Sequence, residues 1–364
     1  GALLASAVVA QVSGVDDLNL VWNTLGGDSS GSMPIGNGDI GANVWVEDNG
    51  DLLLLISKTD AWDANDMLDK IGRVRVSWSG APFAKGKPFR QTLKLGDGVI
   101  EITEGDSPAA MTARVWVDAN HPQIIVSSEG GIATEMTARL ELWRTEKRPI
   151  TKDELNACRE FATVEDGWVT PDVVADRDAD RVVWYHRNES SVWADGMKRQ
   201  GLESVMGQFQ DPLMNRTFGA VMLGDGLVHT EAQLLKSAQP TTAHTLRIVP
   251  LTAQTDTATA WLDAADTLTG QCVAAGDTYS AHTAWWRAFW DRSWVHIGGN
   301  DDAQHVTQVY ALQRWMNACA GRGAYPIKFN GSIFTVEWRD KSDVKSNPDY
   351  RACRGAYWWQ NTRL

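Results

Sequence analysis

The sequence contains little cysteine, and none of it is arranged as a metal or redox motif. The four cysteines are Cys158, Cys272, Cys319 and Cys353, with no CxxC pair and no Cys/His spacing that suits structural zinc. We therefore expect buried free thiols, with a Cys319–Cys353 disulfide as an alternative that spacing alone cannot decide. Nothing in the sequence indicates a metal site or any other cofactor.

Basic runs are also absent. The chain has 34 Lys and Arg against 46 Asp and Glu, a formal net charge of -12 and a pI of about 5.1. A general binder of nucleic acid or of anionic membranes gains affinity by neutralising phosphates, which this composition does not favour. We therefore expect neither nucleic acid nor a membrane as a partner, and the sequence leaves the oligomeric state open.

The only apolar segment at the N-terminus, residues 1–10, is too short to span a membrane. Its small residues end in Val8-x-Ala10, which resembles the end of a secretory signal peptide. We expect residues 1–17 to be a signal-peptide remnant and leader of a secreted or periplasmic protein, clipped at its front because Met and a basic start are missing. An ordinary apolar strand or helix is the alternative.

Tryptophan is abundant, with 18 Trp against 6 Tyr and 8 Phe. Indoles fill large hydrophobic cores, and they also stack on the apolar face of a sugar ring. For a single Trp we favour the core, and for several gathered at one loop we favour a saccharide site.

Residues 18–255 have a β pattern. Leu52–Ile56 is a continuous apolar run typical of a strand buried on both faces, and period-two alternation recurs around Val74–Trp78, Ala113–Val117 and Met136–Leu142. Turn signals separate such runs at Asp48-Asn-Gly50, Gly96-Asp-Gly98 and Gly130-Gly131. More than a dozen strands predict a β-rich super-sandwich, with residues 144–180 as an insertion that contains a short helix.

After residue 255 the period becomes helical. We predict helices over Ala258–Leu268 and Tyr279–Trp290 within a linker of residues 256–300. A third helix, Asp302–Ala320, carries Val306, Val309, Tyr310, Gln313, Met316 and Ala320 on one face. Residues 301–364 end in an aromatic segment whose apolar faces would need partners, so we expect the natural protein to continue.

Two clusters carry the chemistry that we expect. The first is Met33–Ala42, with three glycines in six positions, followed by Ile56–Trp62; a tight structural turn is the alternative. The second joins Tyr325–Gly331 to Tyr357–Arg363, where amides lie beside indoles, as in a sugar pocket. The amides could instead cap helices, and the indoles could fill a core. Glu337, Asp340 and Asp343, the carboxylates nearest this cluster, read as solvated loop charges.

These clusters, in this order, resemble glycoside hydrolase family 95, the inverting α-L-fucosidases and α-L-galactosidases. Pro34–Ala42 resembles the N-terminal signature of that family, and Pro326–Gly331 is similar to its Pro-Ala-Asn-Leu-Gln-Gly motif. Lys58–Trp62 and Gln360–Thr362 match two further motifs loosely. The whole chain also resembles an uncharacterised offshoot of this group whose N-terminal module is of the DUF5703 type.

The resemblance implies a super-sandwich (18–255), a helical linker (256–300) and the first helices of an incomplete (α/α)6 barrel (301–364). It places Asn361 as a residue that positions water or the base, while Trp359 stands where the family has a second Asn. Substrate contacts are expected from Phe329, Asn330, Trp358, Trp359, Gln360 and Arg363, and interdomain loop contacts from Asn37, Lys58 and Trp62. The catalytic Glu and Asp are expected beyond residue 364, so this chain alone should be inactive.

The function implied is that of the N-terminal half of a secreted glycoside hydrolase, inverting, that acts on α-linked sugars of an oligo- or polysaccharide. Inversion requires an acid and a carboxylate about 6.5–9.5 Å apart. Two alternatives remain: a glycoside phosphorylase, and a non-catalytic carbohydrate-binding protein of the same fold.

Overall fold

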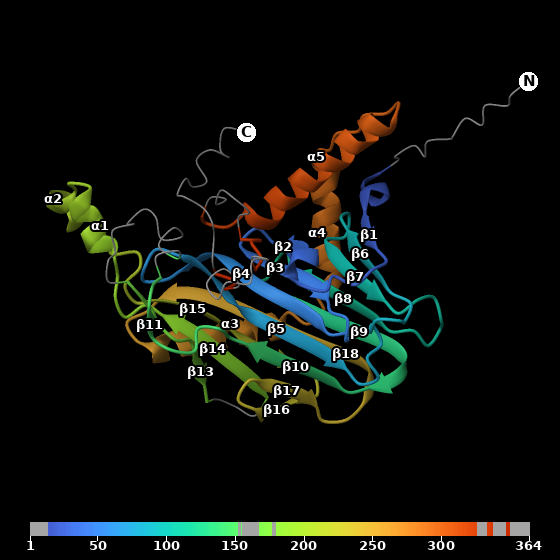
Figure 1. Cartoon of the computed structure of the whole chain (residues 1–364), viewed down its shortest axis with the longest axis horizontal. Helices are drawn as coiled ribbons and strands as arrows, with labels where there is room; N and C mark the ends of the chain where they lie inside the picture. Colours follow the sequence, from blue (N-terminus) through green and yellow to red (C-terminus); the bar gives the residue numbers. More distant parts are fainter. Residues whose placement is uncertain are drawn as a thin grey trace, which may run out of the picture.

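The computed structural model describes residues 14–151, 154, 167–176, 180–325, 333–337 and 347–349. Within them the strands form two large sheets and one small one, and all strand pairs are antiparallel (Figure 1). The nine-stranded sheet has the order β1 (Leu20–Trp22), β6 (Arg90–Lys94), β7 (Val99–Thr103), β8 (Thr112–Val117), β9 (Ile124–Thr134), β18 (Thr241–Gln254), β15 (Arg216–Gly224), β14 (Arg181–Arg187), β13 (Val173–Ala175). The seven-stranded sheet has the order β16 (Leu227–Glu231), β17 (Leu234–Ser237), β10 (Met136–Glu141), β5 (Leu68–Trp78), β4 (Leu52–Trp62), β3 (Ile40–Val46), β2 (Met33–Gly36).

The small elements lie between these strands. The third sheet pairs β11 (Arg148–Pro149) with β12 (Trp168–Val169), and two 3-10 turns, η1 (Val15–Leu18) and η2 (Ser29–Gly31), precede β2. Two short helices, α1 (Trp193–Arg199) and α2 (Glu203–Met206), lie at the end of the sandwich opposite β1 (Figure 1). Neither α1 nor α2 was predicted from the sequence.

The core lies between the two large sheets because one face of each is apolar. Val74, Val76 and Trp78 of β5 are buried, while Arg73 and Arg75 alternate with them and point the other way. Indole N–H groups cross between the sheets: Trp78 donates to the Ser128 hydroxyl (2.9 Å), and Trp184 donates to the Ile71 carbonyl (2.8 Å). The expected β-rich architecture of large antiparallel sheets is confirmed.

The fold confirms a predicted buried strand and two predicted turns, and it contradicts a third turn. Leu52–Ile56 is completely buried within β4, and the turn signals at 48–50 and 96–98 separate β3 from β4 and β6 from β7. The turn predicted at Gly130-Gly131 is wrong, because β9 runs through both residues. Gly131 permits a close approach of two chains instead: a Cβ atom there would lie 2.8 Å from the Cα atom of Ala109.

Most of the described tryptophans belong to this core or to the contacts of the helices with it. The buried ones are Trp45, Trp78, Trp116, Trp184, Trp261, Trp286, Trp290 and Trp315. For these residues the core interpretation of tryptophan is correct. Trp358 and Trp359, for which we favoured a saccharide site, lie outside the described residues.

Three longer helices follow the last strand: α3 (Ala258–Ala274), α4 (Tyr279–Arg292) and α5 (Asp301–Ala320). α3 covers the outer face of the nine-stranded sheet, where Trp261 and Ala265 pack on Val183 and Val221. α4 and α5 meet through Trp286 and Trp315, whose ring centroids are 4.5 Å apart. All three predicted helices are present, while the (α/α)6 barrel that α5 was expected to begin remains a prediction.

Helix α5 does not bury the apolar face that its sequence predicts. Its buried residues are Thr307, Ala311, Trp315 and the last three, Ala318–Ala320. Val306 and Val309, which the helical spacing placed on one apolar face, are 51% and 50% exposed.

Cys319 and Cys272 are buried free thiols, whereas Cys158 and Cys353 lie outside the described residues. Burial raises the pKa of Cys272 to about 11.

A buried histidine attaches α4 to the sandwich. The His282 Nδ1 atom accepts from the Ala119 N–H (3.1 Å), and the Nε2 atom lies 3.0 Å from the Gly98 carbonyl oxygen, to which it donates. Both ring nitrogens are therefore used by the neutral imidazole. Burial lowers the pKa of His282 to about 4.

We expect this histidine to make the protein acid-sensitive. In the unfolded chain His282 takes up a proton near pH 6.5, whereas in the folded chain it does so only near pH 4. The contribution of neutral His282 to the free energy of unfolding is therefore complete above pH 6.5 and is lost as the pH falls towards 4. The loss should reach about 3 kcal/mol. Urea unfolding between pH 7 and 4 should show a shallower pH slope for His282→Gln than for wild type. His305→Gln, a change at an exposed site on α5, should keep the wild-type slope; equal slopes in all three proteins would contradict the assignment.

Candidate functional site

The glycine-rich turn between β2 and β3 is closed by the Asn37 side chain. Its Oδ1 atom accepts from the Ile40 N–H (2.9 Å) and the Asp39 N–H (3.2 Å), and its Nδ2 atom donates to the Asp118 carbonyl (2.9 Å). The Asn37 amide is thus engaged within the sandwich, where it fixes the turn against the β8–β9 connection.

The end of α5 docks on this turn through backbone hydrogen bonds. The Gly38 N–H donates to the Cys319 carbonyl (2.9 Å), and the Gly38 carbonyl accepts from the N–H groups of Arg322 (3.0 Å) and Gly323 (2.8 Å). Gly38 has a φ of +98°, and a Cβ atom there would overlap the Arg322 side chain. The glycines therefore permit two backbones to touch, as the sequence analysis anticipated in general terms.

Lys58 lies beside the same turn, opposite Ile40 in the β3–β4 ladder. Its ammonium contacts Asp60 (2.7 Å) and Asp39 (2.8 Å), and its side chain is only 10% exposed. Burial opposes the charge, but attraction to Asp60 and Asp39 outweighs it, so the pKa of Lys58 is raised. Lys58 is therefore a fixed cation that holds two carboxylates at the rim of the sandwich, and not a base.

Trp62 ends β4, away from the glycine turn. It is half-buried against the core, and its carbonyl accepts from the Asn188 amide (3.0 Å). Between Lys58 and Trp62, the Asp60 carbonyl accepts from Arg216 (3.0 Å), and the same guanidinium donates to the Tyr325 hydroxyl (3.0 Å). β4 thus connects the Lys58 site to Tyr325, which immediately precedes the expected 326–331 motif.

A buried lysine holds the other side of that motif. The Lys70 ammonium, which is fully buried, donates to the Ser57 hydroxyl and to the Ile333 carbonyl (both 2.8 Å). Asn43 donates to the Phe334 carbonyl (3.2 Å), and Glu337 pairs with Arg73 (2.9 Å). The interpretation of Glu337 as a solvated loop charge is wrong, because its side chain is only 18% exposed.

Further along, a buried charge cluster fixes Asp349. Arg144 contacts Asp349 (2.7 Å), Asp172 (2.9 Å) and Asp69 (3.7 Å), and each of these side chains is at most 4% exposed. The Asp69 Oδ1 and Asp172 Oδ2 atoms have no hydrogen-bond partner among the described residues. Burial, and then the nearby Asp349 and Asp63, raise the pKa of Asp69 well above its usual value.

The structure therefore brings Asn37 and Lys58 together at one turn, with Trp62 at the far end of β4. Sequence reasoning missed the residues that hold the C-terminal segment, namely Lys70, Arg144, Arg216 and Asp349. The remaining predicted site residues, Phe329, Asn330, Trp358, Trp359, Gln360, Asn361 and Arg363, lie outside the described residues, as do Asp340 and Asp343.

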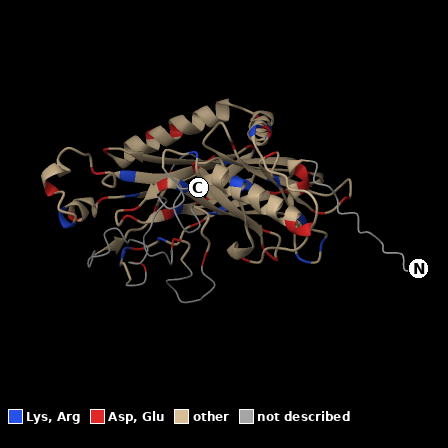
Figure 2. Ribbon diagram, turned by 90° about the horizontal axis from the view of Figure 1, so that it is seen from above, with Lys and Arg blue, Asp and Glu red and all other residues tan. Residues whose placement is uncertain are grey.

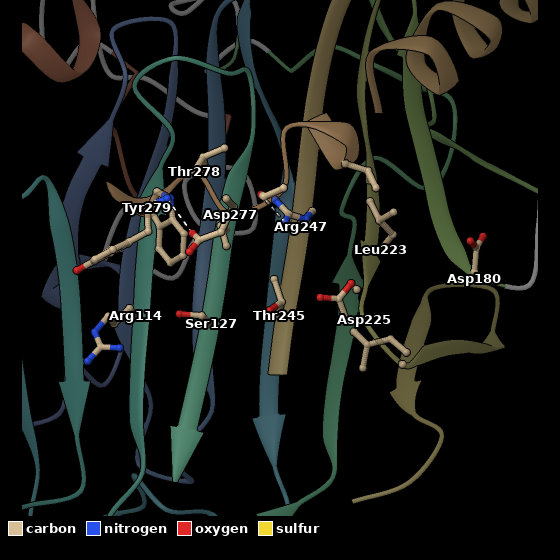
Figure 3. A pocket seen from close by; sticks show the side chains of 17 residues that line it. Arg114, Ser127, Asp180, Leu223, Asp225, Thr245, Arg247, Asp277, Thr278 and Tyr279 are labelled. Atoms are coloured by element: carbon tan, nitrogen blue, oxygen red, sulfur yellow. Dashed lines mark hydrogen bonds between the residues drawn. The ribbon is translucent and has the colours of Figure 1, made fainter. Parts of the chain in front are cut away.

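A second concave region lies on the outer face of the nine-stranded sheet (Figure 3). It encloses about 900 Å³, with Arg114, Ser127 and Thr245 on neighbouring strands and Asp277 and Tyr279 above them at the α3–α4 turn. Arg247 fixes that turn by donating to the Gly276 carbonyl (3.0 Å). An open groove with hydroxyl, carboxylate and guanidinium groups beside a Tyr ring has the size and chemistry of a small-ligand site.

Charge and metal ligands add little to either region. In Figure 2 the positions of Lys and Arg are interspersed with those of Asp and Glu along the described ribbon, without a continuous basic stripe. No group of three or more His, Cys, Asp or Glu side chains among the described residues could hold a metal ion. None of the described helices combines the length and the apolar character that crossing a membrane requires.

The fold is that of a large two-sheet antiparallel sandwich with helices attached to its outer face and one side. Residues 21–295 match the family model described as a domain of unknown function, DUF5703, in its N-terminal part. This match covers most of the chain, and the chain belongs to that family. The DUF5703 part of the expected resemblance is confirmed, and the relation to glycoside hydrolase family 95 remains a prediction.

No curated protein matches the chain. Among solved structures, the chain is similar to one provisionally named as a kojibiose phosphorylase from the human microbiome, with a TM-score of 0.41 and 11% sequence identity. The match covers 81% of this chain and 41% of that one, so this chain spans less than half of the length of its structural neighbour.

Proposed function

We propose that this chain is the N-terminal part of a secreted glycoside hydrolase that acts, with inversion, on α-linked sugars of a complex polysaccharide. The sandwich supplies the scaffold of the substrate site, and helices that follow it supply the catalytic Glu and Asp. The resemblance of the two motif clusters to inverting α-L-fucosidases motivates the reaction type.

One observation carries this proposal: the sandwich holds both flanks of the segment that bears Phe329 and Asn330. Arg216 fixes Tyr325 on one side, and Lys70 and Gly41 contact Ile333 on the other. Burying a lysine or arginine side chain costs free energy unless its donors are satisfied. Here Lys70 donates to the Ile333 carbonyl and Arg216 donates to the Tyr325 hydroxyl. Such support is what positions the residues of a binding site within fractions of an ångström.

The described carboxylates that pair with Lys58 beside the glycine turn do not suit catalysis. Asp39 and Asp60 both pair with Lys58, so we assign neither as the acid or the base. Inversion needs an acid and a base with room for a water molecule between them. Asn361 is assigned to orienting that water.

The test uses the complete protein that contains this chain, with plant and algal polysaccharides as substrates. We expect release of reducing sugar with inverted anomeric configuration, followed by NMR, at the same rate with and without phosphate. Asn361→Ala should lower kcat about 100-fold. Gln208→Ala, at an exposed amide next to α2, should leave kcat unchanged.

The same experiment separates the alternatives. Phosphate-dependent formation of a sugar 1-phosphate would replace the hydrolase by a phosphorylase. Binding of polysaccharide without turnover would favour a non-catalytic carbohydrate-binding protein, for which the groove above β8, β9 and β18 is the favoured site because of its size and its polar lining.

A further inference from the structure

Three arginines gather around one pair of stacked aromatic rings between α4 and α5. The rings of Trp285 and Phe289 are 5.7 Å apart and nearly parallel. The guanidinium of Arg314 lies 4.4 Å from the Phe289 centroid, and that of Arg322 lies 3.7 Å from the Trp285 centroid. Arg292 lies within about 6 Å of both rings.

This cluster lacks the acidic partners that other arginines of the chain have. Arg73, Arg75, Arg114 and Arg144 each contact at least two carboxylates. Among the described residues, Arg292, Arg314 and Arg322 form no ion pair, although the whole chain carries a net charge of -12. Burial and the nearby Arg292 lower the pKa of Arg322, as expected for cations without a counter-charge.

The arginines are also held in place. Arg314 donates to the Phe289 carbonyl (3.2 Å), and Arg322 donates to the Asn37 carbonyl. A guanidinium carries five N–H donors, so each keeps donors for another group. The Arg314 Nε atom is buried and has no acceptor among the described residues.

A cavity of about 360 Å³ opens beside two of these arginines. It is lined by Phe289, Tyr310, Gln313, Arg314, Asn317, Ala318 and Arg322. The volume is large for an inorganic anion and suits a single sugar ring. The side-chain amides and the phenol can bind neutral hydroxyl groups, while the arginine forks match a carboxylate or a sulfate.

We propose that this cavity binds an acidic saccharide, through a uronate carboxylate or a sulfate ester held by Arg314 and Arg322. That the occupant is a saccharide rests on the proposed function; that it carries an oxyanion rests on the arginine cluster. Arg292 adds positive potential at the same rings. The cavity shares Arg322 with the contact between α5 and the glycine turn, and it is distinct from the groove on the nine-stranded sheet.

The experiment is calorimetric titration of the full chain with galacturonate, glucose 6-sulfate, neutral glucose and inorganic sulfate. We expect saturable binding of galacturonate or glucose 6-sulfate, weakened by salt, and none of glucose. The arm that binds identifies the oxyanion as carboxylate or sulfate. Arg314→Gln and Arg292→Gln should each weaken binding at least about tenfold, because each removes one charge near the anion.

Arg90→Gln is the matched control, since it removes the same charge from an exposed position on β6 and should not change binding. Arg292 makes only ring contacts among the described residues, so its variant tests the idea even if Arg314→Gln fails to fold. Three results would overturn the proposal: no acidic sugar binds, inorganic sulfate alone binds, or neither variant weakens binding. Calorimetry measures binding without turnover. The binding result can therefore be interpreted even if the protein does not hydrolyse polysaccharide.

Discussion

Arg144→Met is expected to lower the free energy of unfolding by about 3–5 kcal/mol, as for other buried charges that lose a partner. The change leaves Asp172 and Asp349 buried within 3 Å of the lost guanidinium, with Asp69 nearby. Urea unfolding at pH 7 measures the loss. Arg139→Met removes an exposed pair with Glu231 and should cost less than about 1 kcal/mol.

The pH dependence of stability at Asp69 provides a second test of the same cluster. Since its folded pKa is raised, its contribution to stability is present below the unfolded pKa of about 4 and is lost as the pH rises through the folded value. Asp69→Asn removes that titration. At pH 7 the double variant should therefore be more stable than Arg144→Met alone, and the two should converge in acid. A double variant that is less stable at pH 7 would contradict the charge-cluster account.

Gly38→Ala is expected to lower the free energy of unfolding by about 3 kcal/mol. Its positive φ costs an alanine about 1 kcal/mol, and the added Cβ atom would overlap Arg322 at the end of α5. Either α5 moves away or the turn distorts, and both break the hydrogen bonds between Gly38 and residues 319–323.

Gly80→Ala isolates the backbone contribution. Gly80 also has a positive φ, of +79°, but a Cβ atom there meets nothing within 4 Å. Chemical unfolding of both variants should show a loss of about 1 kcal/mol for Gly80→Ala. Equal losses at the two positions would show that the contact with α5 contributes nothing.

How far the sequence predicts this fold depends on how local each signal is. Leu52–Ile56 and the alternation of Val74–Trp78 reveal buried strands because burial repeats every one or two residues. Gly130-Gly131 misled because the same glycine preference serves a turn and a close approach of two chains. The exposure of Val306 and Val309 depends on what packs against α5, which its own period cannot show.

The site is less predictable for the same reason. Three closely spaced glycines predicted that another chain segment packs tightly against this turn. Nothing in the neighbouring sequence identified Cys319 and Arg322 as the residues that do so. Lys70 lies in a buried stretch of β5 between Asp69 and Ile71, which marks it as unusual, but its acceptor at Ile333 is 263 residues away. Asp69, a carboxylate in the buried strand β5, is the signal that could have pointed to the Arg144 cluster.

The pairing of Lys70 with Ile333, and of Arg144 with Asp349, also constrains how the protein can be made. These contacts span 263 and 205 residues, so the buried Lys70 and Arg144 side chains cannot complete their hydrogen bonds until Ile333 and Asp349 have left the ribosome. Contacts so distant in sequence slow folding, because the chain must close large loops before they form. Nascent chains that stop before residue 349 should therefore stay open to proteases and chaperones, while the strands between residues 20 and 254 are already synthesised.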